Sequence, residues 1–185
     1  MSAEQMIDEA SALMANSFHN TASFLEIFRE ENPIECARKM KYFFSCFLTA
    51  VYLDSSTKYM YPFYDNDGKM EVFFMLIPSS FQLTLWSKIR AGILSFPFVF
   101  GWSGFSRMLT AGDYHDAHHL KVMTANGVVR NHMLVQRMVV RIDKQGRGLG
   151  SLRLGQKLRD IADAQQLPVV LDTQDSRNVP FYTRL

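Results

Sequence analysis

The segment Gln145–Gly150 holds the residues of this chain that are best suited to bind a charged ligand. It reads Gln-Gly-Arg-Gly-Leu-Gly and lies between an apolar run over 132–141 and an amphipathic run over 149–165. Successive glycines let a backbone adopt unusual dihedral angles and approach a ligand closely. The N–H groups in the first turn of the following helix add positive potential, and Arg147 adds a charge. This combination predicts a phosphate or pyrophosphate site.

Two common phosphate-binding motifs do not fit this loop. A P-loop needs Lys before Ser or Thr, whereas here Gly150 precedes Ser151. The dinucleotide fingerprint needs a third glycine, but the corresponding positions are Ser151 and Arg153. A glycine-rich turn without any ligand is the alternative interpretation.

The loop and its neighbours resemble the GCN5-related N-acetyltransferase family. Gln145-x-x-Gly148-x-Gly150 is similar to the family's acyl-CoA pyrophosphate loop, Q/R-x-x-G-x-G/A. Residues 132–151 look like the strand and loop that carry this motif, and residues 172–185 look like the family's L-x-T-x-x-x-x-N-x-x-F-Y-x-x-L-G-F segment. The resemblance is strong over 132–185 and weak over most of the rest of the chain. The most similar branch is the puromycin N-acetyltransferase-like one, which also has an apolar Leu/Gly/Pro/Trp segment before the His-led strand.

The resemblance implies a fold and a cosubstrate. The fold is α/β, with a mixed, mostly antiparallel central sheet that is splayed in the middle and has helices on both faces. Acetyl-CoA would lie in the splay. The implied acyl-CoA-binding residues are Met138, Val139, Val140, Gln145, Gly146, Arg147, Gly148, Leu149, Gly150, Ser151 and Asn178. Because the sequence stops before the family's last two strands, a single domain over 1–185 that lacks those strands is expected.

The same resemblance implies direct transfer of an acetyl group to a primary amine. Tyr182 would stand near the cofactor sulfur and protonate the leaving thiolate; a core tyrosine with a surface hydroxyl is the alternative. A backbone N–H of the preceding strand would hold the oxyanion. Gln136 stands where some relatives carry a carboxylate base, and an amide does not accept a proton at neutral pH. The base is left open among His132, His118, His119 and a water chain.

The hydrophobic periodicity predicts the elements that position these residues. The expected helices are 3–18, 34–53, 149–165 and a short one from Asn178; the expected strands are 59–64, 69–77, 132–141 and 169–171. Asp65–Gly68 is a hairpin turn signal. Residues 83–109 are expected to form one or two short buried helices, and 110–131 a loop or short hairpin. Helix 149–165 is expected to turn Leu152, Leu158, Ile161 and Ala162 inward.

Composition bounds the class of protein. The 185 residues carry 20 basic and 18 acidic side chains, and 48% are hydrophobic, which excludes a wholly disordered chain. Residues 121–185 hold 11 basic and 5 acidic residues, a net charge of +6, which favours an anionic ligand. Cys36 and Cys46 are expected to be reduced thiols, which together with an acidic amino terminus favours a cytoplasmic location. No metal is expected.

These features lead to one preferred function and two alternatives. The preferred function is an acetyl-CoA-dependent N-acetyltransferase that acts on a primary amine of a small molecule or peptide. A non-catalytic acyl-CoA-binding module is the first alternative. The second is a nucleic-acid or membrane-surface binder that uses the basic segment or the apolar stretch Gly92–Phe105. No nucleic acid and no membrane-spanning helix are expected, and a homodimer is left open.

Overall fold

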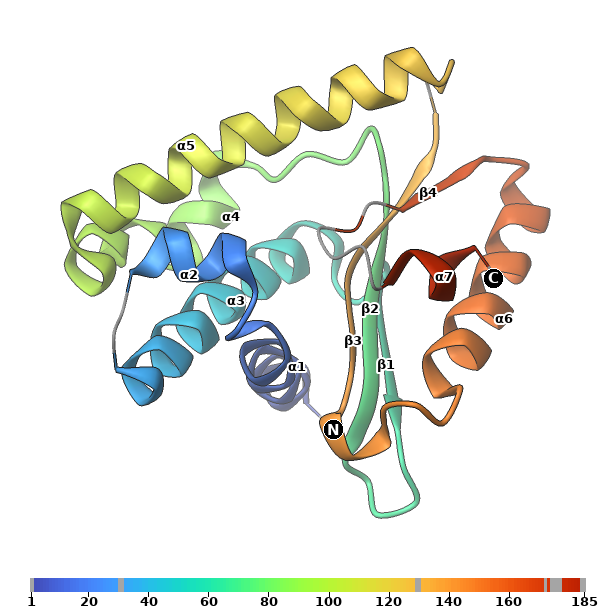
Figure 1. The fold of residues 1–185 in the computed structure, drawn as a ribbon, viewed down its shortest axis with the longest axis horizontal. Coiled ribbons are helices and arrows are strands. Elements are labelled where there is room, and N and C mark those ends of the chain that lie inside the picture. The colour runs from blue at the N-terminus through green and yellow to red at the C-terminus, as the bar shows by residue number, and fades with distance from the viewer. Residues whose placement is uncertain (1, 30–31, 129–130, 172, 174–177, 184–185) are drawn as a thin grey trace. The chain divides into compact units, whose positions relative to one another are not determined.

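Figure 1 shows the computed structural model of the chain, which describes all residues except 1, 30–31, 129–130, 172, 174–177 and 184–185. The chain divides into two compact units. A helical unit comprises 1–56 and 82–130, and a sheet unit comprises 57–81 and 131–185. Each unit is described by itself. The single domain over 1–185 stays a prediction.

The helical unit consists of helices, two of which have well-formed side-chain caps at their amino-terminal ends. These elements are α1 (Ala3–Phe18), α2 (Ala22–Phe28), α3 (Pro33–Ser55), α4 (Leu85–Arg90), the 3-10 helix η1 (Ile93–Ser95) and α5 (Phe96–Ala125). The Ser2 hydroxyl accepts a bond from the Gln5 N–H, and the Gln5 side chain accepts one from the Ser2 N–H. Asn32 caps α3 and Pro33 lies in its first turn. The predicted helices 3–18 and 34–53 are confirmed.

The core of the helical unit is aromatic. Phe24, Phe28, Phe43 and Phe44 from α2 and α3 form a continuous set of ring contacts, with centroid separations of 5.4–6.2 Å. Apolar residues of α3 such as Met40 and Leu48 are fully buried, consistent with the near-continuous apolar pattern of this helix. Cys36 and Cys46 are both buried on α3 and form no disulfide, as expected of reduced thiols, and burial raises the pKa of the Cys46 thiol.

Two expectations for residues 83–131 are wrong. The predicted loop or hairpin over 110–131 is helical as far as Ala125, because that stretch lacks proline and consists mostly of residues that a helix tolerates. Asn126-Gly127 ends this helix, with Gly127 at φ 71°, instead of turning a hairpin. The segment 83–109 is only partly buried, since it exposes both tryptophans and several other large apolar side chains. The short helix α2 was not predicted.

The sheet unit holds a mixed four-stranded sheet. Its strands are β1 (Met60–Tyr64), β2 (Met70–Pro78), β3 (Met133–Val140) and β4 (Val169–Leu171), and they lie in the order β1-β2-β3-β4. The first three are antiparallel, and β4 runs parallel to β3. The β1–β2 hairpin has Gly68 at φ 75°, and the Asp65 carboxylate accepts the N–H bonds of Asp67 and Lys69. All four predicted strands and the predicted turn are confirmed.

Helices α6 (Leu149–Gln165) and α7 (Val179–Tyr182) cover the same face of this sheet (Figure 1). A 3-10 turn, η2 (Ile142–Lys144), connects β3 to the glycine-rich loop. Leu154, Leu158 and Ile161 follow one helical stripe and pack on the sheet core formed by Val72, Phe74, Leu76, Met133 and Val135. Leu152 is 57% exposed, so its predicted inward position is wrong; it falls outside the i, i+4, i+7 stripe that starts at Leu154.

The chain therefore has a mixed α/β structure with a four-stranded mixed sheet and helices. Within the described part of the chain, no helix combines the length and the apolar character needed to cross a membrane.

Candidate functional site

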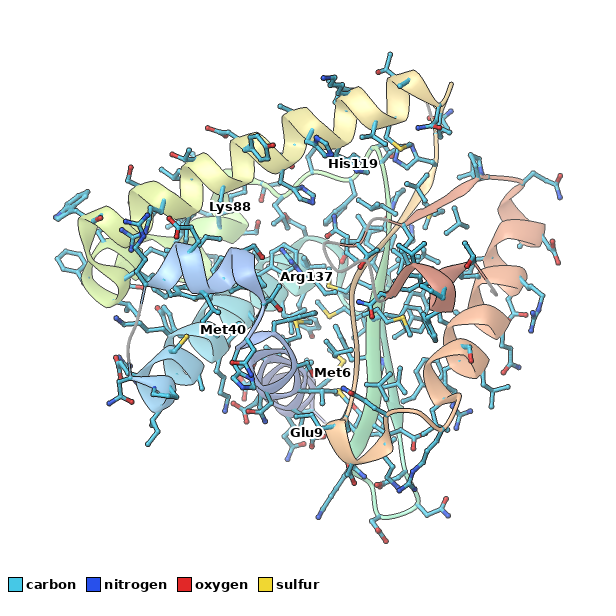
Figure 2. All side chains as sticks on the ribbon, viewed as in Figure 1. Met6, Glu9, Met40, Lys88, His119 and Arg137 are labelled. Atoms are coloured by element: carbon cyan, nitrogen blue, oxygen red, sulfur yellow. The ribbon has the colours of Figure 1, made fainter. Side chains whose placement is uncertain are left out.

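A β-bulge interrupts β3 in the middle of the sheet unit. Val139 pairs with Phe73 and Gln136 pairs with Met75, so Arg137 and Met138 together stand opposite Phe74 alone. Arg137, labelled in Figure 2, has φ 55°, a left-handed conformation that is costly for a residue with a side chain. A bulge re-aims the backbone groups of its strand, and bulges are common beside binding sites. The predicted ligand-binding stretch from Met138 to Val140 begins at this irregularity.

The edge of β3 beyond the bulge is not covered by β4. The parallel pairing of β3 and β4 extends only from Met133 to Val135, and no strand among the described residues continues it. The Arg141 N–H donates to the Glu71 C=O of β2 at 2.8 Å. Because successive strand residues direct their backbone groups to opposite sides, Val140 directs its N–H and C=O toward the uncovered edge.

The glycine-rich loop is tied to this edge by its first residue. The Gln145 side chain donates from Nε2 to the Val140 C=O at 3.0 Å. Gly146 and Gly148 then adopt φ 74° and 72°, where a side chain would cause strain. A Cβ on Gly146 would meet no atom within 4 Å, and one on Gly148 would meet only Ser151 Oγ at 3.9 Å. The loop backbone is therefore open to a ligand on the side where side chains would otherwise stand.

The loop leads directly into α6. The Gly148 C=O accepts bonds from the Leu152 N–H at 3.0 Å and from Ser151 Oγ at 2.9 Å, which fixes the first turn. The N–H groups of a first turn have no partner within their own helix, and the helix dipole makes this end positive. Arg147 is exposed beside it. The arrangement suits the negative charges of a pyrophosphate.

Gly150 allows the start of α6 to lie against β3 and α7. A Cβ at this position would stand 2.9 Å from Met138 Cε, 3.1 Å from Val140 Cγ2 and 3.4 Å from Phe181 Cζ. On either side of Gly150, the Leu149 side chain packs on the sheet core, and the Ser151 hydroxyl bonds the Gly148 C=O in the turn. The contacts of Gly150 thus bring the bulged strand, the loop and α7 together.

Helix α7 places Asn178 and Tyr182 next to one shallow depression. The depression has a volume of about 290 Å³ and is lined by Leu171, Thr173, Val179, Tyr182 and Thr183. Asn178 precedes the helix and donates from Nδ2 to Thr173 Oγ1 at 3.4 Å. The Tyr182 hydroxyl lies 4.0 Å from Met138 Sδ, at the bulge. The two predicted residues therefore share one end of the uncovered edge.

Arg141 holds the other end of β3 in place and was not predicted. Its guanidinium bonds both Asp65, in the β1–β2 turn, and Asp143, in η2, at 2.8 Å each. Hydrogen bonds from the Lys69 N–H and from Arg141 hold the pKa of Asp65 below its ordinary value, and Arg141 lowers the pKa of Asp143. The only sequence signal for this brace was an Arg two residues before an Asp.

This brace predicts an acid-sensitive part of the stability. A carboxylate with a lowered pKa stabilises the fold above its ordinary pKa, and that contribution is lost as pH falls through the lowered value. Asp65→Asn keeps an oxygen for the Lys69 N–H but removes the charge. We expect the wild type to lose urea resistance below about pH 4 and the variant to lose less over the same interval. Parallel curves of unfolding midpoint against pH would contradict this.

The candidate bases lie on different elements of the chain. Gln136 is half-buried within β3, before the bulge. His132 is buried just before the strand, where its backbone N–H donates to Ser79 Oγ at 3.2 Å. His118 and His119 are on α5, in the helical unit. Sequence analysis also missed Glu71, a buried carboxylate that pairs with Arg153 of α6 at 3.5 Å.

Among the described residues, no group of three or more His, Cys, Asp or Glu side chains is placed to hold a metal ion. In comparisons with known proteins, neither a family model nor a curated protein matches the chain.

Proposed function

We propose that the chain is an acetyl-CoA-dependent N-acetyltransferase with the fold of the GCN5-related family. One observation carries the proposal. Gly150 lies at the start of α6, directly after the open glycine-rich loop, and side-chain atoms of the bulged strand and of the Tyr182 helix lie within 2.9–3.4 Å of its Cβ position. A plain glycine-rich turn requires none of these neighbours, whereas an extended ligand with a phosphate end and a reactive end requires all of them.

The residues around the loop fit the parts of an acyl-CoA. Gly146, Arg147 and Gly148, with the first turn of α6, would hold the pyrophosphate. The backbone of Val140, directed to the uncovered edge of β3, would bond the amide groups of the pantetheine arm. Asn178 would contact the same arm from the opposite side. The three-residue pairing of β3 with β4 supports a sheet that opens at this point, which is how the splayed fold holds its cosubstrate.

The chemistry asked of the protein is modest. The thioester supplies an activated acetyl group, and a neutral amine attacks its carbonyl carbon. A backbone N–H near the bulge would stabilise the charge that develops on the carbonyl oxygen. Tyr182 would donate its proton to the departing sulfur. We propose that water carries the proton from the amine, since Gln136 is an amide.

A non-catalytic acyl-CoA-binding module is the second candidate. It is favoured by the same amide at Gln136, which leaves the strand without an ionisable base where relatives have one. It predicts binding of the cosubstrate without turnover. The two buried cysteines, which form no disulfide, favour the cytoplasm as the location for either function.

The deciding experiment measures binding and turnover separately. Calorimetry with acetyl-CoA and CoA should give saturable binding to the full chain. Mass spectrometry of a panel of amines, including polyamines, amino acids, aminoglycosides and peptides, should then show products heavier by one acetyl group. Binding without any acetylated product would favour the module. Absence of binding would contradict both.

A further inference from the structure

The helical unit exposes several large apolar side chains along one short segment of the chain, 85–102. We define the aromatic corner as Leu85, Trp86, Leu94, Phe98 and Trp102, from α4, η1 and the first part of α5. Phe98 is 86% exposed, Trp102 75% and Trp86 66%. These two tryptophans are the only ones in the sequence. Single exposed apolar residues are ordinary, but a group of this size marks an interaction surface.

The corner is distinct from the part of the same segment that is packed. Phe96 and Phe100 face the interior, where Phe100 stacks on Phe28 at 5.4 Å and Phe96 contacts Phe43 at 6.1 Å. Gly101 breaks the helix with φ 71° and ψ 158°, so Phe98 and Trp102 stand on either side of a bend. The segment is thus apolar on both sides, and only one side is covered within the unit.

The charged side chains in the segment that carries the aromatic corner are all basic. Residues 82–112 contain no Asp or Glu but contain Lys88, Arg90 and Arg107. Arg107 is held internally, by bonds to the Ile27 C=O and Ser103 Oγ, whereas Arg90 is exposed. Lys88 and Arg90 lie in the last turn of α4, two and four residues after Trp86 (Lys88 is labelled in Figure 2).

Asp54, at the end of α3, is an acidic group in contact with the start of α4, and its carboxylate is used in hydrogen bonds within the unit. The Asp54 carboxylate accepts bonds from Thr84 N–H, Thr84 Oγ1 and Ser87 Oγ, and thereby caps the start of α4. Lys88 contributes to the lowering of the pKa of Asp54, after the hydrogen bonds from Ser87 and Thr84. Asp54 is therefore used to hold α4 in place, and Arg90 is left as the exposed charge beside the apolar side chains.

We propose that the aromatic corner binds the surface of an anionic lipid bilayer without spanning it. Tryptophan, phenylalanine and leucine side chains insert at the boundary between headgroups and acyl chains, and neighbouring Lys and Arg side chains contact anionic headgroups. A second copy of the chain fits less well, because two such surfaces would bring like charges together. A surface-bound enzyme of this kind would act where an amine or an acyl-CoA is concentrated at a membrane.

Intrinsic fluorescence reports on this surface directly, because both tryptophans belong to it. The full chain is titrated with vesicles of phosphatidylcholine alone and of phosphatidylcholine with 30% phosphatidylglycerol. We expect a blue shift and protection from acrylamide with the anionic vesicles only. Phe98→Ser keeps both probes and should weaken binding about tenfold. The combined Lys88→Gln and Arg90→Gln change should weaken binding to anionic vesicles by a similar factor.

Ile34→Ser is the matched control, since Ile34 is 82% exposed on α3 but lies outside the corner. It should leave vesicle binding unchanged. The proposal is overturned by equal binding to neutral and anionic vesicles, by an equal loss of binding in Ile34→Ser, or by no spectral change with either vesicle. A blue shift that depends on protein concentration without lipid, with a doubled mass in light scattering, would identify a second copy as the occupant and also overturn it.

Discussion

Replacing Tyr182 by phenylalanine is expected to lower kcat by about 10²–10⁴-fold while leaving the affinity for acetyl-CoA nearly unchanged. The ring of Tyr182 packs on the sheet core, and phenylalanine preserves that packing. The hydroxyl lies 4.0 Å from Met138 Sδ, a long and weak contact, and its loss is expected to cost little stability. Under the proposed mechanism, the variant would lack the proton that the leaving thiolate needs.

Tyr61 offers a matched control for this experiment. It is also a half-buried tyrosine of the sheet unit, it packs on the same core, and its hydroxyl donates to the Lys58 C=O at 3.3 Å. Tyr61→Phe removes an equivalent hydroxyl from β1 and should leave kcat unchanged. Steady-state rates of both variants are compared across pH. A Tyr182→Phe enzyme with normal kcat at every pH would show that water or the substrate supplies the proton.

The sequence predicted most of the sheet unit, because its signals are local. The turn Asp65–Gly68 fixes the hairpin through one glycine and one carboxylate, and the apolar runs on either side have strand length. Helix α6 follows from a regular apolar stripe. The bulge at Arg137 gave no such signal, since the left-handed conformation of this arginine occurs within the pairing with β2 and does not follow from residue type.

The helical unit shows where sequence patterns mislead. Asn126-Gly127 can end a helix as readily as it can turn a hairpin, and only the helix formers before it decide between the two. The apolar run Gly92–Phe105 was expected to be buried because its composition is apolar. Composition does not show how many faces of a helix pack against other elements. In the structure, the contacts of Phe96 and Phe100 use one face, and Phe98 and Trp102 are left outside.

The loop of the candidate site could be predicted from the sequence, but the tertiary contacts around the loop could not. Gln145, Gly148 and Gly150 lie within six residues of one another in the sequence. The open turn before α6 could be predicted from the glycines alone. The approach of Gly150 to Met138 and Phe181 joins residues that are 12 and 31 positions away in the sequence, and only tertiary packing creates it. The Arg141 brace is of the same kind, since Asp65 belongs to the distant hairpin turn.

Changing Gly148 to valine is expected to raise the Kd for CoA by about 10–100-fold. A β-branched residue at φ 72° is strained by roughly 1–2 kcal/mol, and its side chain would occupy the space through which a phosphate approaches the loop backbone. Since the nearest atom to the new Cβ is 3.9 Å away, the variant has room to fold. Calorimetry with CoA measures the binding directly and does not depend on turnover.

Gly68→Val is the control that distinguishes loss of the binding site from loss of fold stability. Gly68 has φ 75°, nothing lies within 4 Å of its Cβ position, and it belongs to the same sheet unit. Valine there should lower the unfolding midpoint about as much as valine at Gly148, because both positions impose the same backbone strain. Only Gly148→Val should weaken CoA binding, since only Gly148 belongs to the proposed CoA-binding loop. An equal loss in both variants would trace the effect to stability, and unchanged affinity in a folded Gly148→Val protein would remove the loop from the binding site.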